Sequence, residues 1–144
     1  KEGTTAPIGP GTDSQTLTFE FFDASGAAIS ATNVAIDIFD ITSVEVPAWR
    51  ASYWDAVGFS VTPAALVSEP TLDQGAGTGT RADPFRRSGG RFPTNPLEQA
   101  QYQDEFRFDS FPNGSTMDYT SYNGNQGWHF IAVSSIRFTA QIAC

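Results

Sequence analysis

Residues 34–43 read VAIDIFDITS, and this stretch decides the fold class. Apolar side chains occupy nearly every position from Val34 to Ile41, and Asp37 and Asp40 are the only charged residues among them. Both faces of an extended chain would therefore be largely apolar. Such a run is typical of a strand in the middle of a sheet, buried on most of both sides. Its acidic residues make it, at first sight, a candidate site as well.

The segments around this central stretch alternate apolar with polar residues, which is the pattern of strands with one buried face. The clearest case is the last segment, in which we expect Ile136, Phe138, Ala140 and Ile142 to face the core. Turn residues such as DASG at 23–26 separate the segments. The pattern predicts an all-β fold, an antiparallel β-sandwich or jelly roll of about seven to nine strands.

Two segments lack a strand pattern. Residues 44–55 carry Pro47 and several aromatic rings without a clean period, so we expect a loop there. Residues 73–96 form a long excursion rich in Gly, Pro and Arg. A compact domain seldom carries so long a loop unless it is functional.

The chain of 144 residues is long enough for one domain, which we place at residues 16–144. Residues 1–15, KEGTTAPIGPGTDSQ, contain a single bulky apolar side chain, Ile8, and cannot pack alone. We therefore expect an extended arm that lies on a surface, and a neighbouring molecule could supply it. Pro7, Ile8 and Pro10 are its expected contact residues.

Composition limits the partners and the compartment. Asp and Glu outnumber Lys and Arg by 16 to 8, and the formal net charge is −8. This balance argues against nucleic acid and anionic membranes as partners. No apolar run approaches the roughly 20 residues that cross a bilayer, so membrane insertion is not expected. Few charged residues and a single lysine, Lys1, are typical of an exported bacterial protein at the cell surface.

Cys144 is the only cysteine, so no disulfide can form within the chain. It is either an inert thiol at the end of the last strand or a partner in a disulfide between chains.

No catalytic constellation is present. His129 is the only histidine, and neither a nucleophile elbow, a phosphate-binding loop nor a zinc-protease motif occurs. One histidine and one cysteine make zinc improbable. We therefore expect no enzyme, no catalytic residues and no cofactor.

Calcium is the one credible metal, because hard oxygen ligands suit it. The acidic residues near the end of the central stretch lack the spacing of a calcium loop, so we favour solvated acids over a metal site. These residues are Asp37, Asp40, Glu45 and Asp55.

Several phrases resemble a loose group of bacterial secreted, surface-anchored β-sandwich modules. They are TLTFEFFD at 16–23, IFDI at 38–41, the G-x-G-T-x-x-D-P-F pattern at 77–85 and the I-x-F pattern at 136–138. The resemblance implies an extracellular, non-catalytic module of a surface or adhesive protein. The group often ends its second strand in Asp-Ile-Asp, whereas Thr42 replaces the second acid here.

Two further groups of residues are candidate contact sites. Flat aromatic rings could stack on sugars or could equally cap one end of the core; they are Trp49, Tyr53, Trp54 and Trp128. A basic group could dock on an acidic face of another copy, or could be a solvated loop; it consists of Arg81, Arg86, Arg87 and Arg91.

These observations lead to three hypotheses. The first is a structural subunit that assembles with copies of itself into a filament, pilus-like fibre, sheath or surface layer through its arm. The second is a carbohydrate-binding or adhesin module that binds surface polysaccharide. The third is a virion decoration or tail protein.

Overall fold

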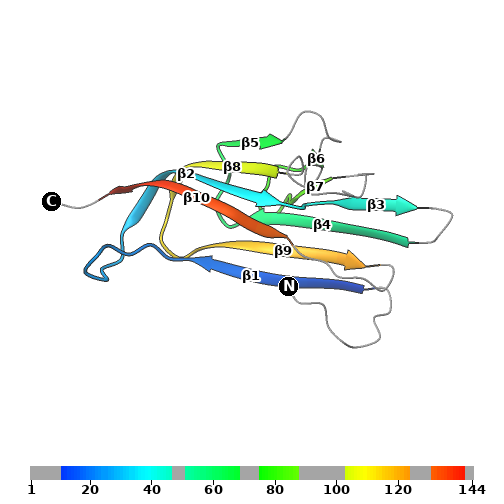
Figure 1. The fold of residues 1–144 in the computed structure, drawn as a ribbon, viewed down its shortest axis with the longest axis horizontal. Helices are drawn as coiled ribbons and strands as arrows, with labels where there is room; N and C mark the ends of the chain where they lie inside the picture. Colours follow the sequence, from blue (N-terminus) through cyan, green and yellow to red (C-terminus); the bar gives the residue numbers. More distant parts are fainter. Residues whose placement is uncertain (1–10, 47–50, 69–74, 88–102, 124–130, 142–144) are drawn as a thin grey trace.

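The computed structural model describes residues 11–46, 51–68, 75–87, 103–123 and 131–141. Within these ranges the chain is all-β and contains no helix (Figure 1). Its ten strands are β1 Gly11–Phe19, β2 Ser30–Phe39, β3 Ser43–Val46, β4 Ala51–Phe59, β5 Ala65–Ser68, β6 Gly75–Ala76, β7 Phe85–Arg87, β8 Gln103–Phe111, β9 Ser115–Asn123 and β10 Ala132–Gln141.

The strands form two antiparallel sheets that pack face to face. The first sheet has six strands in the order β1-β9-β4-β7-β6, with β3 beside β4. The second has four strands in the order β10-β2-β8-β5. The expected β-sandwich is therefore confirmed. We call the face of each sheet that is turned away from the other sheet its outer face.

Aromatic rings fill the space between the sheets. The ring of Phe59 on β4 lies 5.1 Å from that of Phe106 and 4.9 Å from that of Phe108, both on β8. Phe85 on β7 packs against Phe106 at 5.8 Å. Full burial of such a side chain stabilises the fold by about 1.5–3 kcal/mol. Cross-sheet contacts of this kind hold the two layers together.

The central stretch is confirmed as the spine of the second sheet. Strand β2 lies between β10 and β8, and Val34, Ile36 and Ile38 turn fully buried side chains to the core. On the opposite face Asp37 is also buried. The strand is thus buried on both faces, as its sequence predicts, although one of the buried side chains is the carboxylate of Asp37.

The prediction of a loop over residues 44–55 is wrong. Strands β3 and β4 form a hairpin there, with register pairs from Ser43–Trp54 to Val46–Ala51. The period is obscured because the face of β4 that meets the core carries the polar Asp55. The opposite face carries Trp54, an aromatic side chain where a polar one would be expected.

The excursion at residues 73–96 is structured where it is described. Asp83 accepts a hydrogen bond from the Thr78 amide at 2.9 Å, and the Phe59 amide of β4 donates to the Gly79 carbonyl at 2.8 Å. Gly79 has φ +76°, and a Cβ there would lie 2.9 Å from the Phe106 ring. The G-x-G-T-x-x-D-P-F pattern is therefore a loop docked on the core, and it ends at buried Phe85. Residues 88–96 lie outside the described ranges.

Strand β1 begins at Gly11, inside the range that the sequence assigns to the arm. Residues 11–15 pair with β9, from Gly11–Asn123 to Gln15–Tyr119. The part of the arm that precedes β1 is residues 1–10, including Pro7, Ile8 and Pro10, and it lies outside the described residues.

Candidate interaction surfaces

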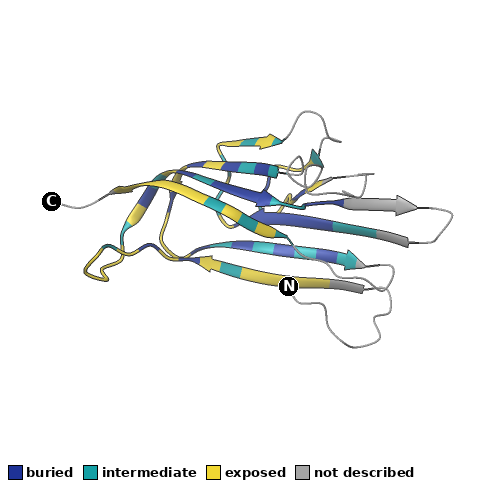
Figure 2. Ribbon diagram, in the orientation of Figure 1, coloured by how far each residue is buried: buried dark blue, intermediate teal, exposed yellow. Residues whose placement is uncertain are grey.

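The two sheets end on the same side of the sandwich in long edge strands. β1 is the last strand of the first sheet and β10 the last strand of the second. Phe21, just after β1, contacts Phe138 of β10, which brings the two edges together. Figure 2 shows mostly exposed residues along both strands, whereas β2 is largely buried. Among the described residues, neither strand has a partner on its outer edge.

Two large apolar side chains of β10, Ile136 and Phe138, are exposed where these edges meet. Ile136 pairs in register with buried Ile36, so it points toward the core, yet it is 40% exposed. Phe138 is 44% exposed although its ring packs against Phe21 at 4.8 Å. We call the surface formed by Phe21, Ile136 and Phe138 the seam. The inward orientation expected for β10 from its alternation is correct for these side chains, but the strand lies at an edge and they stay exposed.

The two edges differ in regularity. The pairing of β10 with β2 has register shifts between Val133 and Ser135 and between Arg137 and Thr139. Such bulges are a common protection of an edge strand against pairing with other chains. β1 pairs with β9 over nine consecutive residues without a shift. Its edge is therefore the more regular template for another strand.

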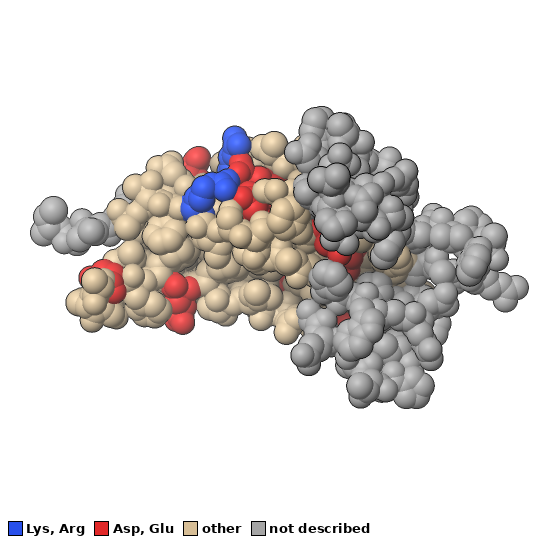
Figure 3. Space-filling model, in the orientation of Figure 1, with Lys and Arg blue, Asp and Glu red and all other residues tan. Residues whose placement is uncertain are grey.

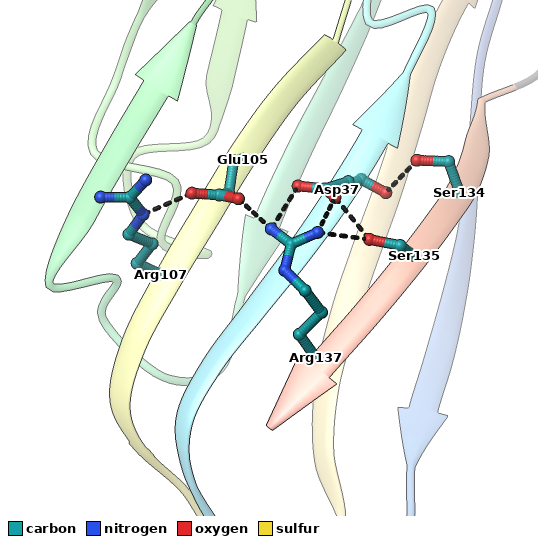
Figure 4. A network of polar contacts seen from close by, with 6 residues as sticks. All are labelled: Asp37, Glu105, Arg107, Ser134, Ser135 and Arg137. Atoms are coloured by element: carbon teal, nitrogen blue, oxygen red, sulfur yellow. Dashed lines mark hydrogen bonds and ion pairs between the residues drawn. The ribbon is translucent and has the colours of Figure 1, made fainter. Parts of the chain in front are cut away.

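A polar network covers the outer face of the second sheet (Figure 4). Arg137 on β10 donates to Asp37 on β2 at 2.6 Å and also pairs with Glu105 on β8. Glu105 pairs in turn with Arg107, and Ser135 donates to Asp37. The network ties three adjacent strands together. In Figure 3 the basic side chains visible on this face gather at one place, directly beside acidic ones.

The network changes the acidity of Asp37. Burial alone would raise the pKa of this carboxyl group. Hydrogen bonds from Ser135 and Arg137, together with the charge of Arg137, outweigh burial and lower the pKa below its usual value. Asp37 is therefore a paired, ionised structural group.

A second polar cluster lies between the sheets. The Tyr119 hydroxyl donates to Asp55 at 2.6 Å, and the Thr42 hydroxyl donates to the same carboxylate at 3.4 Å. All three residues are buried. Burial, and then the negative charge of Asp55, raise the pKa of the Tyr119 hydroxyl. The buried acid is thus hydrogen-bonded within its own domain.

The acidic residues considered for calcium do not form one group. The charge of Asp40 acts on the Tyr119 hydroxyl that binds Asp55, but Asp37 belongs to the other sheet. Asp37 faces outward from the second sheet, whereas Asp55 lies in the core face of the first. The side chain of Glu45 lies outside the described part. Within the described ranges, no group of three or more His, Cys, Asp or Glu side chains is placed to hold a metal ion.

The basic group is partly engaged within its own chain. Arg81 pairs with Asp118 of β9 at 2.7 Å and donates to the Thr116 hydroxyl, also at 2.7 Å. The Arg86 guanidinium lies 4.5 Å from the centre of the Trp54 ring. Arg91 and the side chain of Arg87 lie outside the described part.

An aromatic row crosses the outer face of the first sheet. Trp54 on β4 stacks with Tyr122 on β9 at 6.0 Å and an interplanar angle of 18°. Arg86 comes from β7, on the other side of β4. The Trp54 ring therefore has a neighbour on each of its faces, which limits its use as a platform for sugars.

The other candidate aromatic residues do not join this row where they are described. Tyr53 is adjacent to Trp54 in β4 and so points to the opposite face of the sheet. Trp49 and Trp128 lie outside the described residues. Tyr122 was not singled out from the sequence, although its position in an alternating strand close to turn residues was a usable signal.

No family model, curated protein or solved structure matches this chain. The class that the structure defines is thus an antiparallel β-sandwich with two long edge strands on one side. A search of the described residues finds no helix with the length and apolar character needed to cross a membrane.

Proposed function

We propose that the protein is a non-catalytic, extracellular structural subunit that assembles with copies of itself into a filament, sheath or surface layer. In this proposal residues 1–10 of one copy dock on the open side of a neighbour. The supporting observation is the pair of long edge strands, β1 and β10, on one side of the sandwich. An edge strand presents unpaired N–H and C=O groups to any chain that lies beside it.

The arm has suitable chemistry for docking. Residues 1–10, KEGTTAPIGP, carry one bulky apolar side chain, Ile8, which can act as an anchor. Pro7 and Pro10 restrict the backbone, so less conformational entropy is lost when the segment is ordered on a partner. Arg86 could add attraction to an acidic neighbour. Arg81 contributes less, because it is paired with Asp118.

Removal of residues 1–9 tests the proposal and leaves β1 intact, because β1 begins at Gly11. The full chain is expected to form assemblies visible by electron microscopy and early-eluting material in size-exclusion chromatography. The truncated chain is expected to elute as a monomer with an unchanged melting temperature.

Two variants of the full chain provide the matched control. Ile8→Asp should abolish assembly, and Thr4→Asp, with the same added charge in the same arm, should largely retain it. A full chain that stays monomeric at every concentration contradicts the proposal. So does a truncated chain that assembles as well as the full one.

A carbohydrate-binding or adhesin role is the second candidate. It is supported by the position of Trp54 and Tyr122 on an outer face. The neighbours on both faces of Trp54 make it the weaker candidate. A virion decoration or tail protein would use the same open edges and arm, and the assembly experiment would detect it as self-association.

A further inference from the structure

We propose that β10 is an exchangeable strand, and that the edge of β2 that it leaves open accepts β10 of a second copy. The structure already shows which strand fits this edge, because β10 pairs with β2 within its own chain. An exchanged β10 forms the same contacts between two copies, as in domain swapping. The inference goes beyond the proposed function and does not involve residues 1–10.

The side chains of β10 contribute little to the core. No side chain of residues 132–140 is buried, whereas β2 and β8 both carry fully buried side chains. Ile136 and Phe138 point inward and are still 40% and 44% exposed. Segments with few buried apolar contacts open at a lower free energy than the core of a domain. We therefore expect β10 to open before β2 and β8.

The position of β10 allows it to leave without disturbing another strand. It is the last strand of the chain and the end strand of its sheet, and β2 is its one neighbour among the described strands. Its pairing with β2 is irregular at two places. The eight residues 124–131 join β9 to β10, so Asn123 and Ala132 can lie up to about 30 Å apart. This length of chain allows β10 to reach the sheet of a neighbouring copy.

The edge of β2 favours one kind of strand. The Asp37 side chain is 4% exposed, and it accepts hydrogen bonds from Arg137, at 2.6 Å, and from Ser135. Both donors come from the same face of β10 (Figure 4). Release of β10 removes both from the carboxylate, and hydrogen bonds to a charged group are the strong ones. A strand that binds the open edge well must present an arginine and a hydroxyl at these two positions, and β10 of a second copy presents both.

A disulfide between β10 and β2 records which chain supplies the strand. Thr32 and Thr139 are register partners in this pair of strands. The test chain carries Thr32→Cys and Thr139→Cys, and Cys144→Ser removes the native thiol. It is concentrated under reducing conditions in urea below the unfolding midpoint, diluted into buffer and then oxidised. On a non-reducing denaturing gel we expect at least tenfold more covalent dimer than in a sample oxidised without the urea step.

The control chain carries its cysteine pair between β1 and β9. Ser14 and Thr120 are register partners there, so Ser14→Cys and Thr120→Cys, again with Cys144→Ser, should give crosslinked monomers after the same treatment. Melting temperatures of the reduced chains establish that both are folded. Equal amounts of dimer in the two chains would show random collision and overturn the inference. Crosslinks found only within single chains at Thr32 and Thr139 would overturn it too.

Hydrogen–deuterium exchange followed by NMR tests the release of β10 in the chain without cysteine substitutions. The β10 amides that face β2 should exchange at least tenfold faster than the β8 amides that face β2. Arg137→Met removes the ion pair with Asp37 and should accelerate exchange in β10 by about tenfold without the same effect in β9. Equal protection of β10 and β8 would show that β10 does not open separately, and the inference would fail.

The outcomes separate this inference from the proposed function. Covalent dimers after the urea step, from a full chain that otherwise stays monomeric at every concentration, would support strand exchange and contradict the proposed function. Assembly of the untreated full chain, with crosslinks at Thr32 and Thr139 only within single chains after the urea step, would support the proposed function and reject strand exchange.

Discussion

Asp37 and Arg137 are 100 residues apart in sequence and are joined by an ion pair of 2.6 Å on the outer face of the second sheet. The Asp37 side chain is 4% exposed and that of Arg137 is 57% exposed. An arginine from the edge strand thus covers the buried carboxylate of the central strand. The pair attaches β10 to β2 across a register that contains two irregularities.

Arg137→Met is expected to lower the free energy of unfolding by about 1–3 kcal/mol, because a buried carboxylate loses its charged hydrogen-bond partner. Urea unfolding followed by fluorescence measures the loss. Arg107→Met is the matched control. Arg107 is 56% exposed and pairs with Glu105, so its loss should be within about 1 kcal/mol. Equal losses in the two variants would contradict the assigned role of Arg137.

Stability should fall in acid partly through Asp37. Its folded-state pKa is lowered from the ordinary 3.8, because the hydrogen bonds from Ser135 and Arg137 outweigh burial. The unfolded state therefore binds the proton more readily. The stabilisation is complete above about pH 3.8 and is lost as the pH falls through the folded-state pKa.

Asp37→Asn should reduce this loss of stability in acid, measured as the fall in melting temperature between neutral pH and about pH 2. Some slope should remain, because the pKa of Asp118 is also lowered: hydrogen bonds from Thr16 and Arg81 outweigh its burial. If the fall in melting temperature is unchanged in Asp37→Asn, the Asp37 carboxyl group has the same pKa in the folded and unfolded states.

The sequence predicted the fold class because alternation is strong where one face is buried. The β10 segment was assigned correctly as a strand for this reason. Residues 34–39 were also assigned correctly, because their nearly continuous apolar run predicts a strand buried on both faces, but β2 ends at Phe39 and Asp40 and Ile41 lie beyond it. The β3–β4 hairpin was missed because Asp55 faces the core, where it is hydrogen-bonded to Tyr119. Alternation of hydrophobicity cannot show a strand whose buried position is polar and satisfied by a residue far along the chain.

The surfaces were less predictable than the fold. Ile136 and Phe138 alternate as core residues should, and only the strand order places them at an edge. The pairing of Arg81 with Asp118 joins a loop to a strand that follows it by more than thirty residues. Both facts depend on which strands are neighbours, which local sequence does not specify.

Gly77→Ala is expected to destabilise the fold by about 3 kcal/mol or more, because the change combines a strained backbone with a steric clash. Gly77 has φ +99°, and a Cβ would lie 2.1 Å from the Pro84 carbonyl oxygen. Gly26→Ala is the control, since Gly26 has φ +85° and nothing within 4 Å of a Cβ. It should cost only about 1 kcal/mol. Urea unfolding measures both, and similar losses would mean that the loop at residues 77–85 moves to make room.

Tyr119→Phe is expected to cost about 1–3 kcal/mol, because the buried Asp55 carboxylate loses a hydrogen-bond donor. Tyr122→Phe should be nearly neutral, since Tyr122 is only partly buried and keeps its ring.

Burial and Asp55 raise the folded-state pKa of Tyr119 above the ordinary 10.0. The stabilisation from Tyr119 is therefore complete below about pH 10 and is lost as the pH rises further. Ultraviolet titration of the folded wild type should show a tyrosine component that ionises only above the ordinary pKa of 10.0, and a Tyr119→Phe difference spectrum without that component supports the assignment.

Trp54→Ala distinguishes a structural aromatic row from a sugar-binding platform. Trp54 stacks with Tyr122 and carries Arg86 over its ring, so we expect a loss of stability that exceeds the effect of burial alone. A double-mutant cycle with Tyr122→Ala should give a coupling of about 0.5–1.5 kcal/mol. Arg86→Ala should increase the accessibility of the Trp54 ring to acrylamide quenching, because it uncovers one face. If this face binds polysaccharide, the opposite pattern is expected: Trp54→Ala would abolish binding in a glycan pull-down and leave the melting temperature unchanged. That result would show that Trp54 binds carbohydrate and does not stabilise the fold.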